Sequence, residues 1–408
     1  MRVPALLAAM LLLAAPVEAG LWDRDRPSDD ALPSAADVVS GRYDRMPAAF
    51  YQQRARRLEP TLDALPEFSA ENPLTPEQIR QIADALPAMD DAAVAQFRLG
   101  EFARAIILLD RKNRLAEAIR PERTATAKLA EYRAVANKAA CLAARATQTP
   151  GTPDLQDARD LLAAVVKDDP YNADAQWSLA EIEWRLSRPA YAAEAALFPN
   201  LLGLSIAAFR GERNADALAR HRVAGCIPYL CRRIAYEGTE SIDLMYGLSL
   251  ALSLSGRDEE AVLAWLKLCE MIDNGAVSAV VDAPAARGLK RAMGVHLGAI
   301  YERDAAERLY SELTSQADTW RQSRLMYLEA NLKNGRHPDT EPAFWGGWSQ
   351  QEPGVVLPAL PQEPKDPAIS TALLVAGIGG LVFVLCLLLV FILFLGRNKS
   401  PHPNVNEI

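Results

Sequence analysis

The side chains that most often carry catalysis or bind metals are few and far apart in this chain. There are four histidines, and none has a neighbour at metal-binding spacing: His221, His296, His337 and His402. The chain also lacks G-x-S-x-G, phosphate-loop and H-E-x-x-H patterns. We therefore predict no catalytic, cofactor-binding or metal-binding residues, no cofactor, and a protein that is not an enzyme.

The cysteines leave two interpretations open. Cys226 and Cys231 are separated by Ile-Pro-Tyr-Leu, which is the wrong spacing for a thioredoxin-type dithiol. In an oxidising compartment the two would form a disulfide; otherwise they are buried free thiols. Cys386 lies in a long apolar run and is most simply a small apolar residue.

Charge limits the partners that the chain can bind. The formal net charge of −8 argues against nucleic acid, which calls for a basic face. One basic cluster stands against this acidic background, and its members are Arg210, Arg213, Arg220, His221, Arg222, Arg232 and Arg233. It either meets an acidic segment, anionic lipid or envelope polymer, or it is a solvated helix face whose arginines pair with nearby acids.

Apolar segments at both ends of the chain predict where the remainder lies. Arg2, the apolar run Val3–Val17 and small residues after it indicate a secretory signal peptide at residues 1–19. The uncharged run Ile369–Leu395 is longer than the roughly 20 residues that cross a bilayer. We therefore predict a transmembrane helix at residues 368–396 that contacts the lipid bilayer.

Basic residues on one side of this run predict its orientation. Arg397 and Lys399 follow it directly, and positive charge favours the cytoplasmic side. Residues 397–408 are therefore expected to be a cytoplasmic tail, and the amino-terminal domain to be periplasmic. Because no Asn-x-Ser/Thr sequon lies between the two apolar segments, we expect a single-pass protein of a bacterial inner membrane.

Composition and periodicity predict helices between these segments. Aromatic residues make up only 7% of the chain, and Ala, Leu, Arg and Glu favour helices. Residues 20–46 have few large apolar side chains and are expected to form an extended or mobile leader. Helical periodicity begins at Pro47, is interrupted at Pro60, and resumes after an N-cap sequence, Thr75-Pro76-Glu77-Gln78.

Two windows predict helical hairpins with a glycine at the turn. In residues 90–112 the turn is at Gly100, and Ala105 lies on the inner face of the second helix. In YGLSLALSLSGRDEEAVLAWLKL the turn is at Gly256, with Ala261 at the close crossing and Trp265 as a large filler. Partial copies surround residues 158–180 and 297–301, and a last helix is expected from 320 to 334.

This pattern resembles the tetratricopeptide-repeat (TPR) superfamily over roughly residues 92–335. The resemblance implies an all-α, TPR-like helical-hairpin solenoid at residues 47–348, with irregular insertions, plus the one C-terminal transmembrane helix. Uncharacterised exported, membrane-anchored bacterial TPR-containing proteins are similar to the hairpin at 90–112. Such solenoids offer a concave surface, so other proteins are the implied partners.

Two segments near the carboxyl end leave alternatives open. Regularly spaced prolines predict an extended tether at residues 349–367, or a segment that lies back along the helices. The sequence Phe-Trp-Gly-Gly-Trp at 344–348 is either a docking patch or an aromatic plug that closes the last helix pair. In the membrane run, Ala372, Ala376 and Gly380 form a small-residue stripe, from which we hypothesise self-association.

The leading functional prediction is a membrane-anchored, extracytoplasmic TPR scaffold that mediates protein–protein interactions in envelope assembly or organisation. The first alternative is an envelope hydrolase or polymer-acting enzyme with an unrecognised site. The second is a transmembrane sensor, which would need a partner because the cytoplasmic tail is too short for a signalling domain.

Overall fold

The computed structural model describes residues 21–27, 31–66, 73–149, 153–187, 200–205, 208–209, 211–237, 241–276, 278, 286–290, 302–348 and 357–358. The chain divides into two units, residues 1–360 and 361–408, and all described residues belong to the first. Every regular element among them is a helix, so the all-α prediction is confirmed there. The predicted signal peptide, transmembrane helix and tail lie outside the described residues, as do the 372/376/380 stripe and nearly all of the tether.

None of the described helices combines the length and apolar character that crossing a membrane requires.

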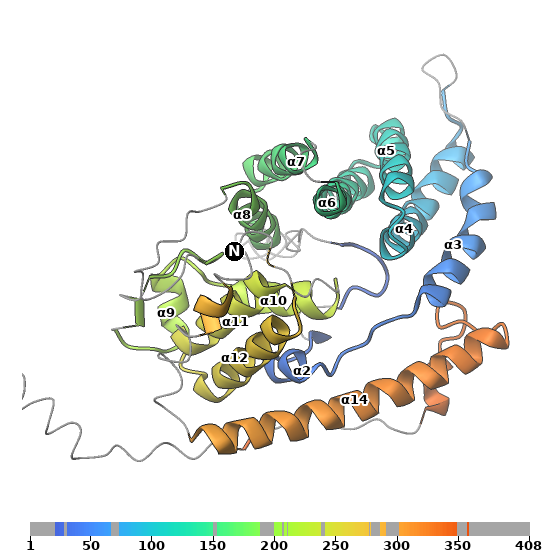
Figure 1. The fold of residues 1–408 in the computed structure, drawn as a ribbon. Coiled ribbons are helices and arrows are strands. Elements are labelled where there is room, and N and C mark those ends of the chain that lie inside the picture. Colours follow the sequence, from blue (N-terminus) through green and yellow to red (C-terminus); the bar gives the residue numbers. More distant parts are fainter. Residues whose placement is uncertain are drawn as a thin grey trace, which may run out of the picture. The chain divides into compact units, whose positions relative to one another are not determined.

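Six helices follow one another as a row in which each packs on the previous one (Figure 1). They are α3 (Ala48–Asp63), α4 (Pro76–Arg98), α5 (Phe102–Ile119), α6 (Thr124–Gln148), α7 (Asp154–Asp168) and α8 (Ala173–Ser187). The start of α4 confirms the predicted cap, since Thr75 and Gln78 form a reciprocal capping box and Pro76 is the first helical residue. Pro60 does not interrupt α3 but lies inside it, one turn before the helix ends.

The predicted turn at Gly100 is confirmed. Gly100 has φ +78°, a left-handed conformation that glycine adopts without strain, and it separates α4 from α5. Ala105 and Leu109 on α5 are fully buried, as the hairpin pattern predicts.

A second group contains α9 (Ala215–Arg220), α10 (Cys226–Ala235), α11 (Ile242–Leu254) and α12 (Asp258–Asp273). Every residue of α11 is buried, and the α11–α12 hairpin turns at Gly256, as predicted. Ala261 is fully buried at the crossing, where its carbonyl oxygen accepts a 3.0 Å hydrogen bond from Ser249 Oγ. The short helix α2 (Ala35–Ser40) packs on α10 and α12, although it comes from the stretch predicted to be a mobile leader.

One long helix connects the two groups. Helix α14 (Arg303–Lys333) contacts α12 and α2 as well as α3 (Figure 1). The sequence prediction of a separate last helix at 320–334 is therefore wrong at its start, because no glycine or proline stops the helix between residues 303 and 333. Its end is confirmed, with Gly335 at φ +76° directly after the last turn.

The aromatic segment after α14 closes the end of the row. Phe344 begins a 3₁₀ turn, η3 (Phe344–Gly347), and is 1% exposed against Phe50 of α3 and Leu328 of α14. The guanidinium of Arg324 lies 3.6 Å from the centre of the Trp345 ring. The structure therefore supports the interpretation as a plug rather than a docking patch.

The disulfide interpretation of Cys226 and Cys231 is wrong. Both are buried free thiols on α10, and burial raises the pKa of each to about 12. Five residues of α-helix turn the chain by about 500°, so the two side chains leave the helix in directions far apart and cannot meet.

The two turn glycines offer a matched test of the fold. Alanine at either position must adopt a left-handed backbone, which costs about 1–2 kcal/mol. At Gly256 a Cβ would also lie 2.9 Å from the backbone oxygen of Arg213, whereas at Gly100 no atom lies within 4 Å. We expect Gly256→Ala to lower the free energy of unfolding more than Gly100→Ala, as measured by urea denaturation. Equal losses would contradict the packing described for Gly256.

Candidate functional site

The candidate site is centred on residues 21–27, which we call the amino-terminal segment. Its first residue, Leu21, is fully buried. Figure 1 draws the segment in the darkest blue, and its contacts lie on α3, α4, α6, α8 and α10. The stretch forms no helix, which agrees with an extended leader, but its burial and polar contacts do not agree with a free, mobile one.

A single asparagine on α6 pairs with the backbone of the segment. The Trp22 N–H donates to Asn137 Oδ1 at 2.6 Å, and Asn137 Nδ2 donates to the Trp22 carbonyl oxygen at 3.0 Å. Asn137 is 1% exposed, so its amide forms these hydrogen bonds inside the protein and away from solvent. An amide side chain that bonds both the N–H and the C=O of one residue recognises the peptide backbone, so it can bind an extended peptide of any sequence.

The acidic side chains of the segment meet an arginine of α3. Arg54 Nη1 lies 3.3 Å from Asp23 Oδ2 and 2.7 Å from Asp25 Oδ2, and Arg54 itself is fully buried. The hydroxyl of Tyr236, just after α10, donates to Asp23. Arg54 also forms two bonds to Asp339, which follows α14, at 2.9 and 2.6 Å.

The basic side chains of the segment meet acids on other helices. Arg24 binds Asp91 of α4 through its backbone N–H at 2.8 Å and its Nε at 2.6 Å. Arg26 Nη2 donates to Asp174 of α8 at 2.6 Å, and the Arg26 guanidinium lies 4.1 Å from the centre of the Trp22 ring. Each side chain of the alternating sequence Asp-Arg-Asp-Arg therefore meets a group of opposite charge.

Burial shifts the titration of two carboxyls here. Loss of water, together with the nearby charge of Asp25, raises the pKa of Asp23 to about 6, although Tyr236 and Arg54 act in the opposite direction. Loss of water also raises the pKa of Asp90 to about 6 and lowers that of its partner Lys112. The charged forms of Asp23, Asp90 and Lys112 are therefore disfavoured by burial inside the domain.

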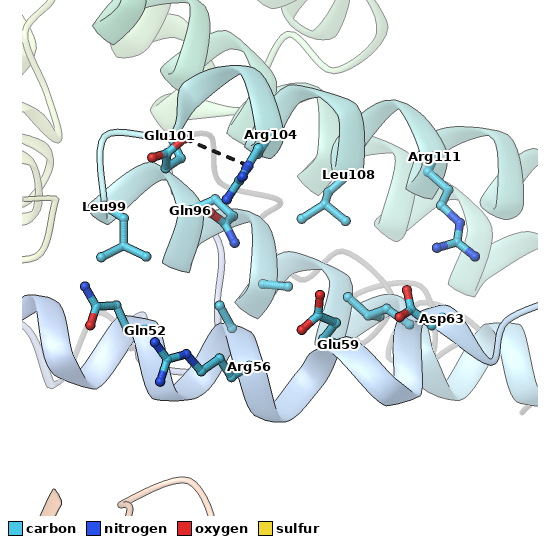
Figure 2. A pocket seen from close by; sticks show the side chains of 13 residues that line it. Gln52, Arg56, Glu59, Asp63, Gln96, Leu99, Glu101, Arg104, Leu108 and Arg111 are labelled. Atoms are coloured by element: carbon cyan, nitrogen blue, oxygen red, sulfur yellow. Dashed lines mark ion pairs between the residues drawn. The ribbon is translucent and has the colours of Figure 1, made fainter. Parts of the chain in front are cut away.

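A second, open feature lies on the row of helices. A groove of about 500 Å³ runs between α3, α4 and α5, and we call it the α3–α5 groove (Figure 2). Its lining mixes charged side chains with apolar ones: Gln52, Ala55, Arg56, Glu59, Leu62, Asp63, Ala92, Gln96, Leu99, Glu101, Arg104, Leu108 and Arg111.

Charges of both signs line the two long sides of the α3–α5 groove. Arg56 and Glu59 come from α3, and Arg104 comes from α5, where its Nε lies 4.0 Å from Glu101 Oε2 (Figure 2). Leu108 contributes an apolar patch between them. Each long side of the groove therefore carries charges of both signs beside an apolar strip.

The basic cluster predicted from sequence is not one surface. Arg233 pairs with Glu181 of α8 at 2.7 Å, Arg213 pairs with Asp258 at 2.8 Å, and Arg232 is 3% exposed. These three therefore follow the second interpretation, in which the arginines pair with nearby acids. Arg210 lies outside the described residues.

The histidines do not gather either. His337 is 2% exposed, stacks on Phe50 and accepts a 3.1 Å hydrogen bond from the Asp339 N–H at its Nδ1. His296 and His402 lie outside the described residues. Within the part of the chain that the structure describes, no group of three histidine, cysteine or acidic side chains is placed to hold a metal ion.

Sequence reasoning missed the amino-terminal segment and its partners. The available signal was Trp-Asp-Arg-Asp-Arg, an alternation of charges after an aromatic residue in an otherwise polar stretch. Arg54, Asp91 and Asn137 carry no local signal, because each lies within an ordinary amphipathic helix.

Removing the guanidinium of Arg54 should destabilise the domain strongly. We expect Arg54→Met to lower the free energy of unfolding by about 3–5 kcal/mol, because it leaves the buried carboxylate of Asp23 without its cation and removes the two bonds to Asp339. The control is Arg80→Ala, which removes an exposed ion pair with Glu77 and should cost less than about 1 kcal/mol. Chemical denaturation measures both, and comparable losses would refute the central role of Arg54.

Stability should also depend on the ionisation of Asp23. Its pKa in the folded state, about 6, lies above its ordinary value of 3.8, so the folded state holds the proton more tightly. The contribution of the protonated carboxyl is complete below pH 3.8 and is lost as the pH rises through 6. Relative to wild type, Asp23→Asn should therefore gain up to about 3 kcal/mol in stability between pH 4 and pH 7.

Urea denaturation at half-unit pH intervals measures this difference. Asp318→Asn, on an exposed part of α14, controls for the removal of one carboxylate. A stability difference between Asp23→Asn and wild type that does not change with pH would contradict the shifted pKa.

Comparisons with known proteins give no family for this chain: no family model matches it, and neither a curated protein nor a solved structure is significantly similar to it. The resemblance to TPR proteins thus depends on the residue pattern alone.

Proposed function

We propose that this chain is a membrane-anchored, extracytoplasmic TPR-like scaffold that binds segments of other proteins, and that it is not an enzyme. The observation that carries the proposal is the α3–α5 groove, an open space of about 500 Å³ lined by charges of both signs. The row of paired helices from α3 to α8 supports the TPR-like part, because stacked hairpins bury their apolar faces on one another.

The groove supports binding more than it supports catalysis. Its cations are Arg56, Arg104 and Arg111, and its anions are Glu59, Asp63 and Glu101. All of them lie in α3 or α5 except Glu101, which immediately precedes α5. Such an arrangement orients a partner segment by complementary charge, and the leucines add apolar contact. We propose that the partner is an extended or helical protein segment that carries both acidic and basic residues.

The apolar segments near both ends of the chain support a proposal for its location. We propose that residues 1–19 direct export, that residues 368–396 span the inner membrane, and that the helices work in the periplasm in envelope assembly or organisation. The proline-rich stretch before the span would then set the distance of the groove from the bilayer.

Site-specific crosslinking in native membranes tests the binding function. A photo-crosslinking amino acid at Gln96, in the α3–α5 groove, should form adducts with other proteins, whereas one at exposed Lys128 of α6 should not. Arg56→Glu with Arg104→Glu should reduce the Gln96 adducts several-fold, because the groove then repels an acidic partner residue.

The matched control is Arg114→Glu, which makes the same change of charge on α5 at an exposed position that does not line the groove. Two results would refute the α3–α5 groove as the binding site. One is an equal yield of adducts at Gln96 and Lys128, and the other is an equal loss of Gln96 adducts in the groove variant and in Arg114→Glu.

A further inference from the structure

The residues that face the amino-terminal segment form a second surface, separate from the α3–α5 groove. We call it the segment-binding surface and define it by Arg54, Asp91, Asn137, Asp174 and Tyr236. These five residues come from α3, α4, α6, α8 and the end of α10, so the surface collects one group from each of several helices.

This surface has the properties of a peptide-binding site. Asn137 pairs with backbone groups, which any extended peptide offers, and the charged groups select side chains by sign. Trp22 adds an aromatic anchor: its ring lies 4.1 Å from the guanidinium carbon of Arg26 and 4.7 Å from that of Arg133 on α6. The expected ligand is therefore an extended peptide that has an aromatic residue followed by side chains of alternating charge.

Two of the three charged groups of the surface, Arg54 and Asp174, are also paired without the segment. Arg54 binds Asp339 at 2.6 Å, and Asp174 binds Arg232 of α10. Removing the segment would therefore leave Arg54 and Asp174 in contact with opposite charges. Buried Asp91, in contrast, would lose Arg24 and would favour a new peptide that brings a cation to it.

The segment itself is not enclosed on every side. The side chain of Arg24 is 42% exposed and that of Asp25 is 33% exposed, whereas Asp23 and Arg26 are buried. A competing peptide can thus meet the surface from this exposed edge. If the signal peptide ends at residue 19 as predicted, the segment would be joined to the rest of the mature domain at one end only.

We propose that the segment-binding surface is a binding site for an extended peptide in which an aromatic residue is followed by alternating acidic and basic residues. Residues 21–27 occupy it as a tethered ligand of the chain's own. A protein segment of the same chemistry binds by displacing them. The proposal does not depend on the α3–α5 groove, and either site can fail without the other.

The test uses the full-length protein in detergent and a fluorescein-labelled peptide of sequence GLWDRDRP. In the release variant, Arg24→Ala with Arg26→Ala, the tethered segment loses its ion pairs with Asp91 and Asp174, but no residue of the surface is changed. A short tether holds the segment at an effective concentration on the order of millimolar, so wild type should bind the peptide weakly. Fluorescence anisotropy should show at least tenfold tighter binding to the release variant.

Two controls address specificity. A peptide with aspartate and arginine exchanged, GLWRDRDP, should bind at least tenfold more weakly than GLWDRDRP. Adding Asp91→Asn to the release variant should weaken binding of GLWDRDRP, because it removes the charge that faces Arg24. Equal binding of the two peptides, or equal binding by wild type and release variant, would overturn the proposal.

Thermal melting followed by circular dichroism covers the case in which the release variant does not fold. If the variant is unfolded and GLWDRDRP restores a cooperative melt while GLWRDRDP does not, the binding site is supported. If the variant is folded but binds no peptide, or is unfolded and not restored, the segment is an inseparable part of the core and the proposal is wrong.

Discussion

The fully buried guanidinium of Arg54 is the interaction on which the rest of the domain depends. It contacts Asp23 and Asp25 from the amino-terminal segment and Asp339 from beyond α14. These residues are up to 316 positions apart in the chain, from 23 to 339. A buried cation of this kind cannot be left unpaired without a large cost, so the three parts of the chain have to arrive at the same place.

This constraint explains how the row of helices is completed. Consecutive hairpins alone pack only on their sequence neighbours, and such a row can in principle continue in either direction. Here α14 lies against α3 at one end and against α12 and α2 at the other. The aromatic plug around Phe344 adds apolar burial where α14 meets α3, so the first helix of the row is covered by the last long helix.

The amino-terminal segment links that architecture to the proposed function. It reaches groups on several helices of the row, yet its contacts are mostly polar and part of its edge faces solvent. Apolar packing would require side chains of one particular shape. The segment is held instead by ion pairs and by the hydrogen bonds between Asn137 and the Trp22 backbone, which another peptide can also form. The α3–α5 groove differs, because it is open and its charges face solvent space.

The sequence by itself determined the local structure. The glycines at 100 and 256, the cap at Thr75 and the end of α14 were predictable, because turns and helix ends depend on residues a few positions apart. It also predicted the close packing at Ala261. Only the tertiary structure decided the pairing of Arg54, the docking of residues 21–27, the free thiols of α10 and the length of α14. Each of these depends on contacts between distant residues, or on the orientation of a helix face, which local periodicity does not encode.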